Sequence, residues 1–418
     1  MAKHRKIRRF EYEWGGQRRQ WWKRFLLSVT VVVVFGIVGW IAYEPVYNLV
    51  MGLDTQRSAA SSQSETEASS SSQSSSAPAV QPEPEQPQGL PEKTYYLPPQ
   101  VVASPTQLEQ QLSAIKAAGG TGVAFELKNA KGQVLYKSEL PQVAQALTQA
   151  ESPYDLPGLL RTITDAGLAP VGVLHAFQDS TATSAASLSD GAVKYMDGPV
   201  NWLDNAKADG GKPWLNPNSP IARDYILALV EETTRMGVSN LVLESVQFPT
   251  GFSLHLASYG GSPDRPAVLA DFVTQAQAVA QRSDAQVYPV VRLDALVGAN
   301  DIPYGSQPGK LLQAAGQGIV DVSPAQFGAG VATPQLTLTS PLLAPYDTVQ
   351  AALAVAMERL GADTQLELAA KVQAYTAAGV DAASNKAYGK AEADQQQQAA
   401  QEQGLTKSYY YSPAGVYQ

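Results

Sequence analysis

Two glutamates close short apolar runs in this sequence and could serve as an acid and a base. Glu126 lies in GVAFEL, two residues before Lys128, and Glu244 directly follows NLVL. A carboxyl group can donate a proton, accept one or attack an electrophilic carbon, and its surroundings decide which by setting its pKa. Residues two apart on a strand share a face, so Lys128 could instead neutralise Glu126 in a structural pair. Both glutamates are candidate catalytic groups, each with a structural alternative.

The small number of histidines and the absence of cysteine exclude several kinds of catalytic site. The chain has three histidines and no cysteine, so neither a metal cluster nor a thiolate nucleophile is expected, and no cofactor motif occurs. His175 ends an apolar run and could line a pocket or simply be hydrogen-bonded in the core. The sequence lacks a G-x-S-x-G elbow and a phosphate loop, which argues against ester and nucleotide hydrolysis. Three acids near other strand ends are not distinguished by their spacing: Asp294, Asp321 and Glu367.

Strands and helices alternate over residues 95–418 and would position these side chains. Strand-like runs occupy 122–127, which we expect to be the first strand, and then 170–175, 240–246, 286–292, 319–322, 365–368 and 408–411. Helices between them should begin at Asp155, Ser219 and Ser262, where a capping side chain precedes a proline. Such alternation predicts βαβ units and a parallel sheet. With seven or eight units and no glycine-rich fingerprint after the first strand, the pattern favours a closed (β/α)8 TIM-like barrel over an open sheet.

A different pattern fills the N-terminal part of the chain. Residues 25–43 form an uncharged run of 19 residues, long enough at ~1.5 Å per residue to cross a ~30 Å hydrocarbon core. The basic segment 1–24 precedes it, and positively charged flanks stay on the cytoplasmic side. A helix in a soluble core is the alternative, while a cleaved signal peptide would need a shorter apolar region and a cleavage site. We expect a single-pass type II protein of the cell membrane with an extracellular C-terminal domain.

Composition separates the domain from its surroundings and limits its partners. Residues 44–94 are rich in serine, glutamine and proline, and such a segment cannot bury enough apolar surface to fold, which predicts a disordered linker. Residues 1–24 carry a net charge of +7, so the remaining residues carry −15. An acidic domain is not expected to bind nucleic acid, because phosphate contacts need lysine and arginine on the folded surface. The sequence does not indicate an oligomeric state.

Seven segments together resemble a known family. Four of them are specific: GVAFELKNAKGQVLY, PVGVLHAFQD, PWLNPNSPIARDYI and NLVLESVQFP. Three weaker ones follow in order, VYPVVRLDAL, GIVDVSPAQFG and YYYSPAGVY, and the last of these is expected to form the strand that closes the barrel. The set resembles a bacterial family described as putative glycoside hydrolases, which are TIM-barrel domains often anchored at the surface of Gram-positive cells. The resemblance spans residues 119–417 and so covers the expected domain.

The resemblance implies hydrolysis of O-glycosyl bonds in a cell-envelope or environmental polysaccharide, without metal or cofactor. That reaction uses two carboxyl groups at either side of the scissile bond. Glu244 stands where the family has aspartate, and Glu126 stands at an acidic position of the family pattern, so these two are the expected catalytic residues. Substrate-binding roles are expected for seven further residues: Lys128, His175, Trp214, Asn216, Gln247, Arg292 and Asp294.

The sequence also departs from the family pattern, and five of the departures remove a charge. Asn216 replaces an aspartate, Gln178 a lysine and Gln247 an arginine. Asn129 and Ala130 replace acids. Amides keep hydrogen bonding but stabilise transition-state charge poorly. Two interpretations follow, a divergent hydrolase and a catalytically degenerate barrel that binds cell-wall glycan without cleaving it.

The expected topology can be tested on intact cells. Externally added protease should release the domain by cutting the linker between residues 58 and 92, because an extended, unfolded segment is cleaved readily. Fragment masses determine the cut site. Protection of the linker combined with cleavage within the first 24 residues would contradict the orientation.

Overall fold

Eight parallel strands form a closed barrel in the computed structural model, which describes residues 89–361 and 365–417. The barrel strands are β1 (Lys93–Leu97), β2 (Gly122–Lys128), β5 (Ala169–His175), β7 (Asn240–Glu244), β9 (Gln286–Arg292), β10 (Gln317–Asp321), β13 (Glu367–Gln373) and β14 (Lys407–Tyr411). Each pairs with the next, and β1 pairs with both β14 and β2, which closes the cylinder. The predicted (β/α)8 barrel is confirmed.

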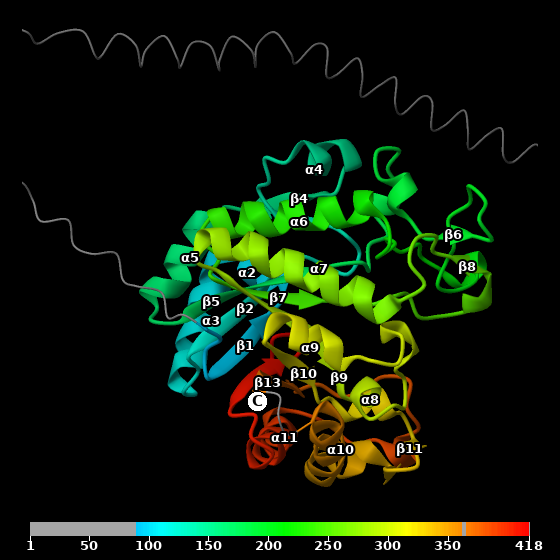
Figure 1. Ribbon diagram of the computed structural model, residues 1–418. Coiled ribbons are helices and arrows are strands. Elements are labelled where there is room, and N and C mark those ends of the chain that lie inside the picture. Colours follow the sequence, from blue (N-terminus) through cyan, green and yellow to red (C-terminus); the bar gives the residue numbers. More distant parts are fainter. Residues whose placement is uncertain (1–88, 362–364, 418) are drawn as a thin grey trace, which may run out of the picture. The chain divides into compact units, whose positions relative to one another are not determined.

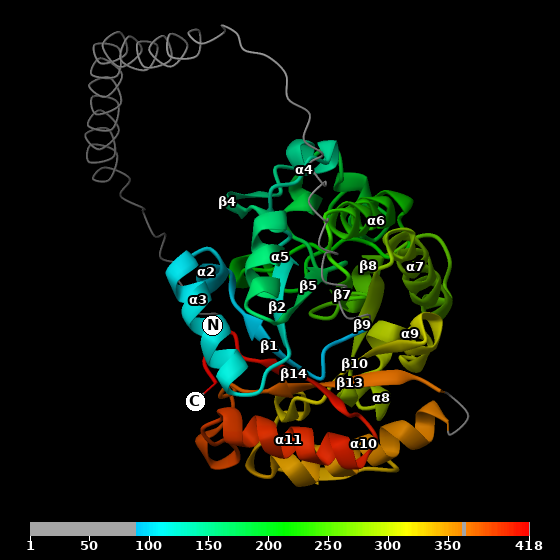
Figure 2. The ribbon, with the colours of Figure 1, turned by 90° about the vertical axis from the view of Figure 1, so that its left-hand side faces the viewer.

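Helices surround the strands, as Figure 2 shows. The main ones are α3 (Pro105–Ala117), α5 (Leu156–Asp165), α6 (Pro220–Arg235), α7 (Arg265–Ala280), α9 (Gly309–Ala315), α10 (Pro345–Leu360) and α11 (Lys390–Glu402). In Figure 1, α6 and α7 cover one side of the barrel, and α10 and α11 cover the opposite side. Helix α5 illustrates the sequence logic, because Leu156, Leu159, Leu160 and Ile163 fall on one face and are buried.

Smaller elements extend from this frame. Strands β3 (Val134–Tyr136) and β4 (Gln149–Tyr154) continue the sheet beyond β2. The antiparallel pairs β6 (Lys194–Tyr195) with β8 (Ala257–Ser258), and β11 (Gly330–Ala332) with β12 (Thr337–Thr339), lie in strand-to-helix connections. Short helices are α2 (Pro99–Val102), α4 (Pro141–Ala146) and α8 (Leu293–Leu296). Active sites of this fold are built in such connections, at the carboxyl ends of the strands.

Residues 1–88 lie outside the described part of the chain, and with them the expected basic segment, membrane helix and most of the linker. Within residues 89–361 and 365–417, no helix combines the length and apolar character needed to span a bilayer.

Most strand boundaries differ from expectation by one or two residues, and two strands differ more. The first barrel strand is β1, KTYYL, and the expectation that 122–127 comes first is wrong. Prolines at 91, 98 and 99 give β1 the appearance of linker. Strand β13 starts and ends later than the expected 365–368, because alanines in ELAAKVQ weaken its strand signal. Helix α7 begins at Arg265 and its cap is Asp264, which accepts a hydrogen bond from the Ala267 amide, rather than Ser262.

Period-two alternation along the strands gives the barrel interior an apolar layer below a polar ring. The apolar layer includes Ala124, Val173, Val242, Val290, Ile319, Ala369 and Tyr409. Two residues further along each strand, the same inward face carries the ring: Glu126, His175, Glu244, Arg292, Asp321, Lys371 and Tyr411. All seven lie at or near the carboxyl ends of their strands. Barrel geometry therefore gathers ionisable side chains that are far apart in the sequence.

Removal of β14 should prevent closure of the barrel. Tyr410 stacks on Tyr95 of β1 with ring centroids 4.7 Å apart, and the Tyr417 hydroxyl donates to the Tyr96 carbonyl at 2.6 Å. A chain that ends at residue 406 would leave β1 and β13 with unpaired edges, and such edges promote aggregation. We expect aggregated protein by size-exclusion chromatography. A truncated protein that stays soluble and melts like the full chain would refute the closure.

Candidate active site

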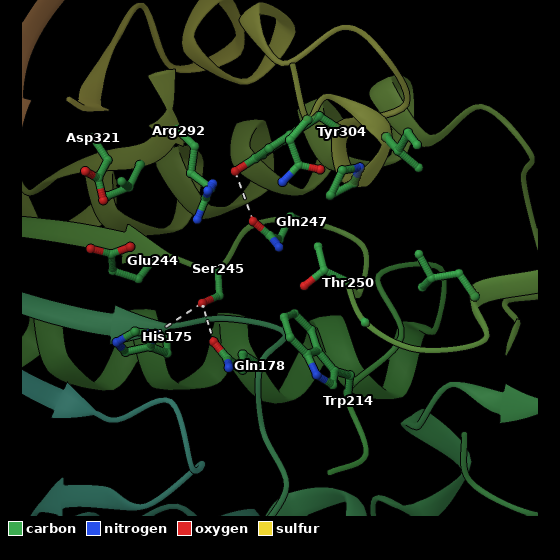
Figure 3. Close-up of a pocket in the computed structure, with 16 residues that line it drawn as sticks. His175, Gln178, Trp214, Glu244, Ser245, Gln247, Thr250, Arg292, Tyr304 and Asp321 are labelled. Atoms are coloured by element: carbon green, nitrogen blue, oxygen red, sulfur yellow. Dashed lines mark hydrogen bonds between the residues drawn. The ribbon is translucent and has the colours of Figure 1, made fainter. Parts of the chain in front are cut away.

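A cavity of about 580 Å³ opens at the carboxyl ends of β5, β7, β9 and β10. Five of the residues expected from the sequence line it: His175, Trp214, Glu244, Gln247 and Arg292. Figure 3 shows Glu244, Asp321, Arg292 and His175 gathered at the strand ends, with Trp214 and Thr250 across the cavity from them. The cavity has the size of sites that enclose small-molecule ligands.

Lys371 holds two carboxylates of this site together. Its Nζ lies 2.7 Å from Glu244 Oε1 and 3.4 Å from Asp321 Oδ2, and its side chain is 9% exposed. The Tyr411 ring also packs against the ammonium, with its centroid 4.5 Å away. Burial alone would lower the pKa of Lys371, but Glu244 and Asp321 outweigh it and raise the pKa above its ordinary value. Lys371 is therefore a permanent cation, and its charge favours the ionised form of Asp321.

Asp321 is the more strongly fixed of these two carboxylates. It accepts hydrogen bonds from the Ser323 amide at 3.0 Å and the Ser323 hydroxyl at 2.5 Å. Burial would raise the pKa of Asp321, yet the Lys371 charge and the Ser323 hydrogen bonds together bring the pKa below its ordinary value. Asp321 is an anion at neutral pH and is poorly suited to donate a proton.

The pKa of Glu126 is shifted in the opposite direction, above its ordinary value. Burial raises its pKa, and the nearby charge of Glu244 adds to this effect. A hydrogen bond from Tyr96 and the charge of Lys371 offset the rise only in part. Glu126 does not itself line the cavity; its side chain is 14% exposed, and its Oε1 lies 3.9 Å from Nε2 of His175, which does. Among these acids, Glu126 is the one whose surroundings favour a retained proton.

His175 is neutral and supports that preference. Burial, together with the positive charges of Lys128 and Lys371, lowers the pKa of His175 to about 3. Its Nδ1 lies 3.1 Å from the Ser245 hydroxyl, which donates to Gln178 Oε1 at 3.2 Å. This network assigns the imidazole proton to Nδ1, so unprotonated Nε2 faces Glu126. Nε2 lies 3.9 Å from Glu126 Oε1, beyond hydrogen-bonding distance, and the neutral imidazole supplies no positive charge that would stabilise the Glu126 carboxylate.

Ser245 occupies a strained backbone position that turns the chain at the end of β7. Its φ of 57° lies in the left-handed region, which a serine adopts at a cost of about 1–3 kcal/mol. The turn brings the Ser245 hydroxyl between His175 and Gln178, so the strain is located where the hydrogen-bond network needs it.

Arg292 and Asp294 form a bidentate pair beside the cavity. The two nitrogen–oxygen distances are 2.9 Å and 2.6 Å. Arg292 is 40% exposed on its side chain and lines the cavity, whereas Asp294 is 4% exposed and does not. Asp294 therefore orients the guanidinium of Arg292, and only Arg292 is placed to meet a ligand.

Besides Asp294, two other expected substrate-binding residues do not line the cavity. Lys128 is fully buried, lies 3.0 Å from Asp179 Oδ2 and donates to the His175 carbonyl at 2.7 Å. A bulge in β2 between Glu126 and Lys128 breaks the regular alternation, and Lys128 pairs with Asp179. Asn216 donates to the Tyr259 carbonyl at 2.7 Å and accepts from the Asn218 amide, so it shapes a loop.

Polar and aromatic groups complete the opposite wall. The Trp214 indole donates to Asp204 at 3.0 Å, which fixes the ring, and Gln247 accepts a hydrogen bond from the Tyr304 hydroxyl at 3.0 Å. Residues 89–361 and 365–417 contain no grouping of histidine, aspartate and glutamate that could hold a metal ion.

Sequence reasoning missed Lys371 and did not select Asp321. Both could have been found by counting in steps of two from the apolar layer, since Lys371 follows Ala369 and Asp321 follows Ile319. The expected end of β13 at residue 368 removed Lys371 from consideration. Tyr304 lies on a connection after β9 and carried no recognisable signal.

Comparison with known proteins gives a family match and several structural neighbours. The model of the family described as "Putative glycosyl hydrolase domain" matches residues 94–417. No curated protein matches the sequence.

Solved structures with a similar fold share little sequence. The glycoside hydrolase domain of PgaB (BpsB) from Bordetella bronchiseptica is 13% identical, with a TM-score of 0.55 over 78% of this chain and 94% of that one. A hypothetical protein from Ruminiclostridium thermocellum is 20% identical, with a TM-score of 0.41 over 47% and 96%. The cycloalternan-forming enzyme of Listeria monocytogenes is 14% identical, with a TM-score of 0.45 over 77% and 28%. The similarity to the PgaB domain concerns the fold.

The Lys371 cluster should contribute strongly to stability. Lys371→Met would leave Glu244 and Asp321 close together without their cation, and removing one partner of a buried ion pair costs about 3–5 kcal/mol. Lys390→Met is the matched control, because Lys390 pairs with Asp394 on an exposed surface and should change stability by at most about 1 kcal/mol. Urea unfolding of both variants measures the difference. Equal, small losses for both would contradict the role of Lys371.

Proposed function

Because the chain belongs to the family described as putative glycosyl hydrolase domains, we propose that its barrel hydrolyses glycosidic bonds in a polysaccharide. One observation supports this most directly. Glu126 has a raised pKa, while Glu244 in the same ring is ion-paired with Lys371. A carboxyl group with a raised pKa, in the same ring as a second carboxyl group that is paired with a lysine, suits acid–base hydrolysis of a glycosidic bond.

In the proposed reaction Glu126 is the general acid. It donates its proton to the glycosidic oxygen as the bond from that oxygen to the anomeric carbon breaks. Glu244 acts on the anomeric carbon from the other side, either by attacking it or by taking a proton from the water that does. Water finally supplies the hydroxyl of the new reducing end. Asp321 shares Lys371 with Glu244 and keeps the lysine in place.

Neighbouring groups are placed to hold the sugar. Arg292, Gln247 and His175 line the cavity and can hydrogen-bond hydroxyl groups, while the face of Trp214 can pack against a sugar ring. Lys128 acts indirectly, since it anchors the His175 carbonyl through a buried hydrogen bond.

A glycan-binding barrel without hydrolysis is the second candidate, and one contact favours it. The Lys371 ammonium lies 2.7 Å from Glu244 and reduces the nucleophilicity that a reacting carboxylate needs. Gln178 and Gln247 also favour this candidate, because their neutral amides replace charged residues of the family pattern. Such a domain would retain glycan without releasing reducing ends.

We also propose that the protein is a single-pass type II membrane protein with its barrel outside the cell. The basic segment 1–24 and the uncharged run 25–43 support this location. Cell-wall glycan would then be the accessible polysaccharide, and the acidic remainder of the chain argues against nucleic acid.

Replacement of Glu244 should separate the two candidates. Full-length wild type and Glu244→Gln are incubated with cellulose, chitin, dextran and peptidoglycan sacculi, and new reducing ends are measured. Glu244→Gln should lower release by about two to four orders of magnitude, the scale of a positioned acid or base. The control Glu367→Gln lies at the opposite end of β13, where Glu367 pairs with Lys407, and should have wild-type activity.

Substantial and equal release by wild type and Glu244→Gln would contradict the role of Glu244. Binding of glycan by wild type without any release would favour the non-catalytic candidate instead.

The pH profile should report Glu126. Because the reaction needs its protonated form, kcat/KM of wild type should fall as pH rises through the raised pKa of Glu126. Glu126→Gln should lose turnover of polysaccharide but keep turnover of a dinitrophenyl glycoside, whose leaving group needs no proton. The variant should also lack the basic limb of the wild-type profile. An unchanged basic limb in Glu126→Gln would assign the acid to another residue.

A further inference from the structure

An exposed phenylalanine lies beside the cavity on a rigid loop. Phe252 is 63% exposed, and its neighbours Gly251 and Leu254 line the cavity. Isolated exposed apolar side chains are common on protein surfaces and need no explanation. Phe252 differs because its backbone is held from several sides at the edge of a polar site.

Two buried tryptophans and Asp204 fix the loop. The Phe252 amide donates to the Asp204 carbonyl at 2.7 Å, and the Trp202 indole donates to the Ser253 carbonyl at 3.2 Å. Gly251 has a φ of 129°, and a Cβ there would lie 2.1 Å from the Asp204 oxygen, so only glycine fits. Asp204 in turn accepts from the Trp214 indole in the cavity wall. The position of Phe252 is thus coupled to the wall of the site.

A second exposed apolar side chain borders the same cavity. Ile302 lines it and is 60% exposed. Its carbonyl accepts from the Arg265 guanidinium at 3.3 Å, and the carbonyl of the following Pro303 accepts from the Phe248 amide at 3.0 Å. Like Phe252, Ile302 is held outward by a fixed backbone. We name Phe252 and Ile302 together the rim pair.

Sugar rings match such a pair chemically. One face of a pyranose presents C–H groups that pack on aromatic and aliphatic carbon, while its edge hydroxyls remain in water. The cavity volume of about 580 Å³ is that of a site for a small-molecule ligand, so a long glycan cannot fit inside it entirely. A longer glycan chain held in the cavity must cross its edge, and the rim pair supplies apolar surface there.

We propose that the rim pair is a subsite for a sugar unit outside the cavity, which makes the domain selective for polymeric glycan over short oligosaccharides. The proposal rests on the proposed function of the same site and adds its substrate class. Stacking on one aromatic ring should raise the affinity for longer chains by about tenfold.

Affinity as a function of chain length tests the proposal. Full-length Glu244→Gln, which should bind without cleaving, is titrated with β-1,4-linked N-acetylglucosamine and with α- and β-linked glucose oligomers, from disaccharide to octasaccharide. Affinity in one of these series should rise with length by about tenfold. Adding Phe252→Ala should abolish the rise but leave disaccharide affinity unchanged. Phe252→Tyr should retain it, as should the control Leu147→Ala, which truncates an 83% exposed side chain at the end of α4.

Absence of binding, binding that does not depend on length, or a length effect that survives Phe252→Ala would each overturn the proposal. Hydrolysis by wild type is measured separately. Turnover without a length effect would leave the hydrolase assignment standing and reject the rim subsite. A length effect without turnover would support the rim subsite and reject the hydrolase assignment.

Discussion

The ammonium of Lys371, held inside the barrel mouth between Glu244 and Asp321, is the interaction on which the site depends. Three charged groups with 9–21% exposed side chains would be costly to bury separately. Together they neutralise one another in part, and Tyr411 covers the lysine. With Lys371 engaged by these two acids, its charge offsets only part of the rise in the pKa of Glu126. Lys371 thus pairs with Glu244 and Asp321, while the pKa of Glu126 stays raised.

Closure of the barrel makes this arrangement possible. Glu126, Glu244, Asp321 and Lys371 come from β2, β7, β10 and β13, and no two of these strands pair except β10 and β13. Only a closed cylinder brings their ends into one ring. The β1–β14 pairing that completes it therefore supports the site as well as the fold. The stacked Tyr95 and Tyr410 at that junction stabilise the closed barrel and, through it, the ring.

Much of this architecture could be predicted from sequence, for identifiable reasons. Seven barrel strands and the position of Glu244 follow from apolar runs that end in polar residues. Strand β1 could not be recognised, because the prolines on both sides of it resemble those of the linker. Lys128 was misplaced because a bulge after Glu126 is set by tertiary packing against Asp179 and leaves no trace in local alternation. The pairing of Lys371 with Glu244 spans 127 residues and depends on barrel closure.

The central claim is that the pKa of Glu126 is raised in the ring that also holds the ion-paired Glu244. It is tested most directly by NMR titration of protein labelled with ¹³C at the glutamate carboxyl groups, with the Glu126 signal assigned by its loss in Glu126→Gln. Our account predicts a midpoint for Glu126 above the ordinary glutamate value of about 4.3. A midpoint at or below that value would contradict it.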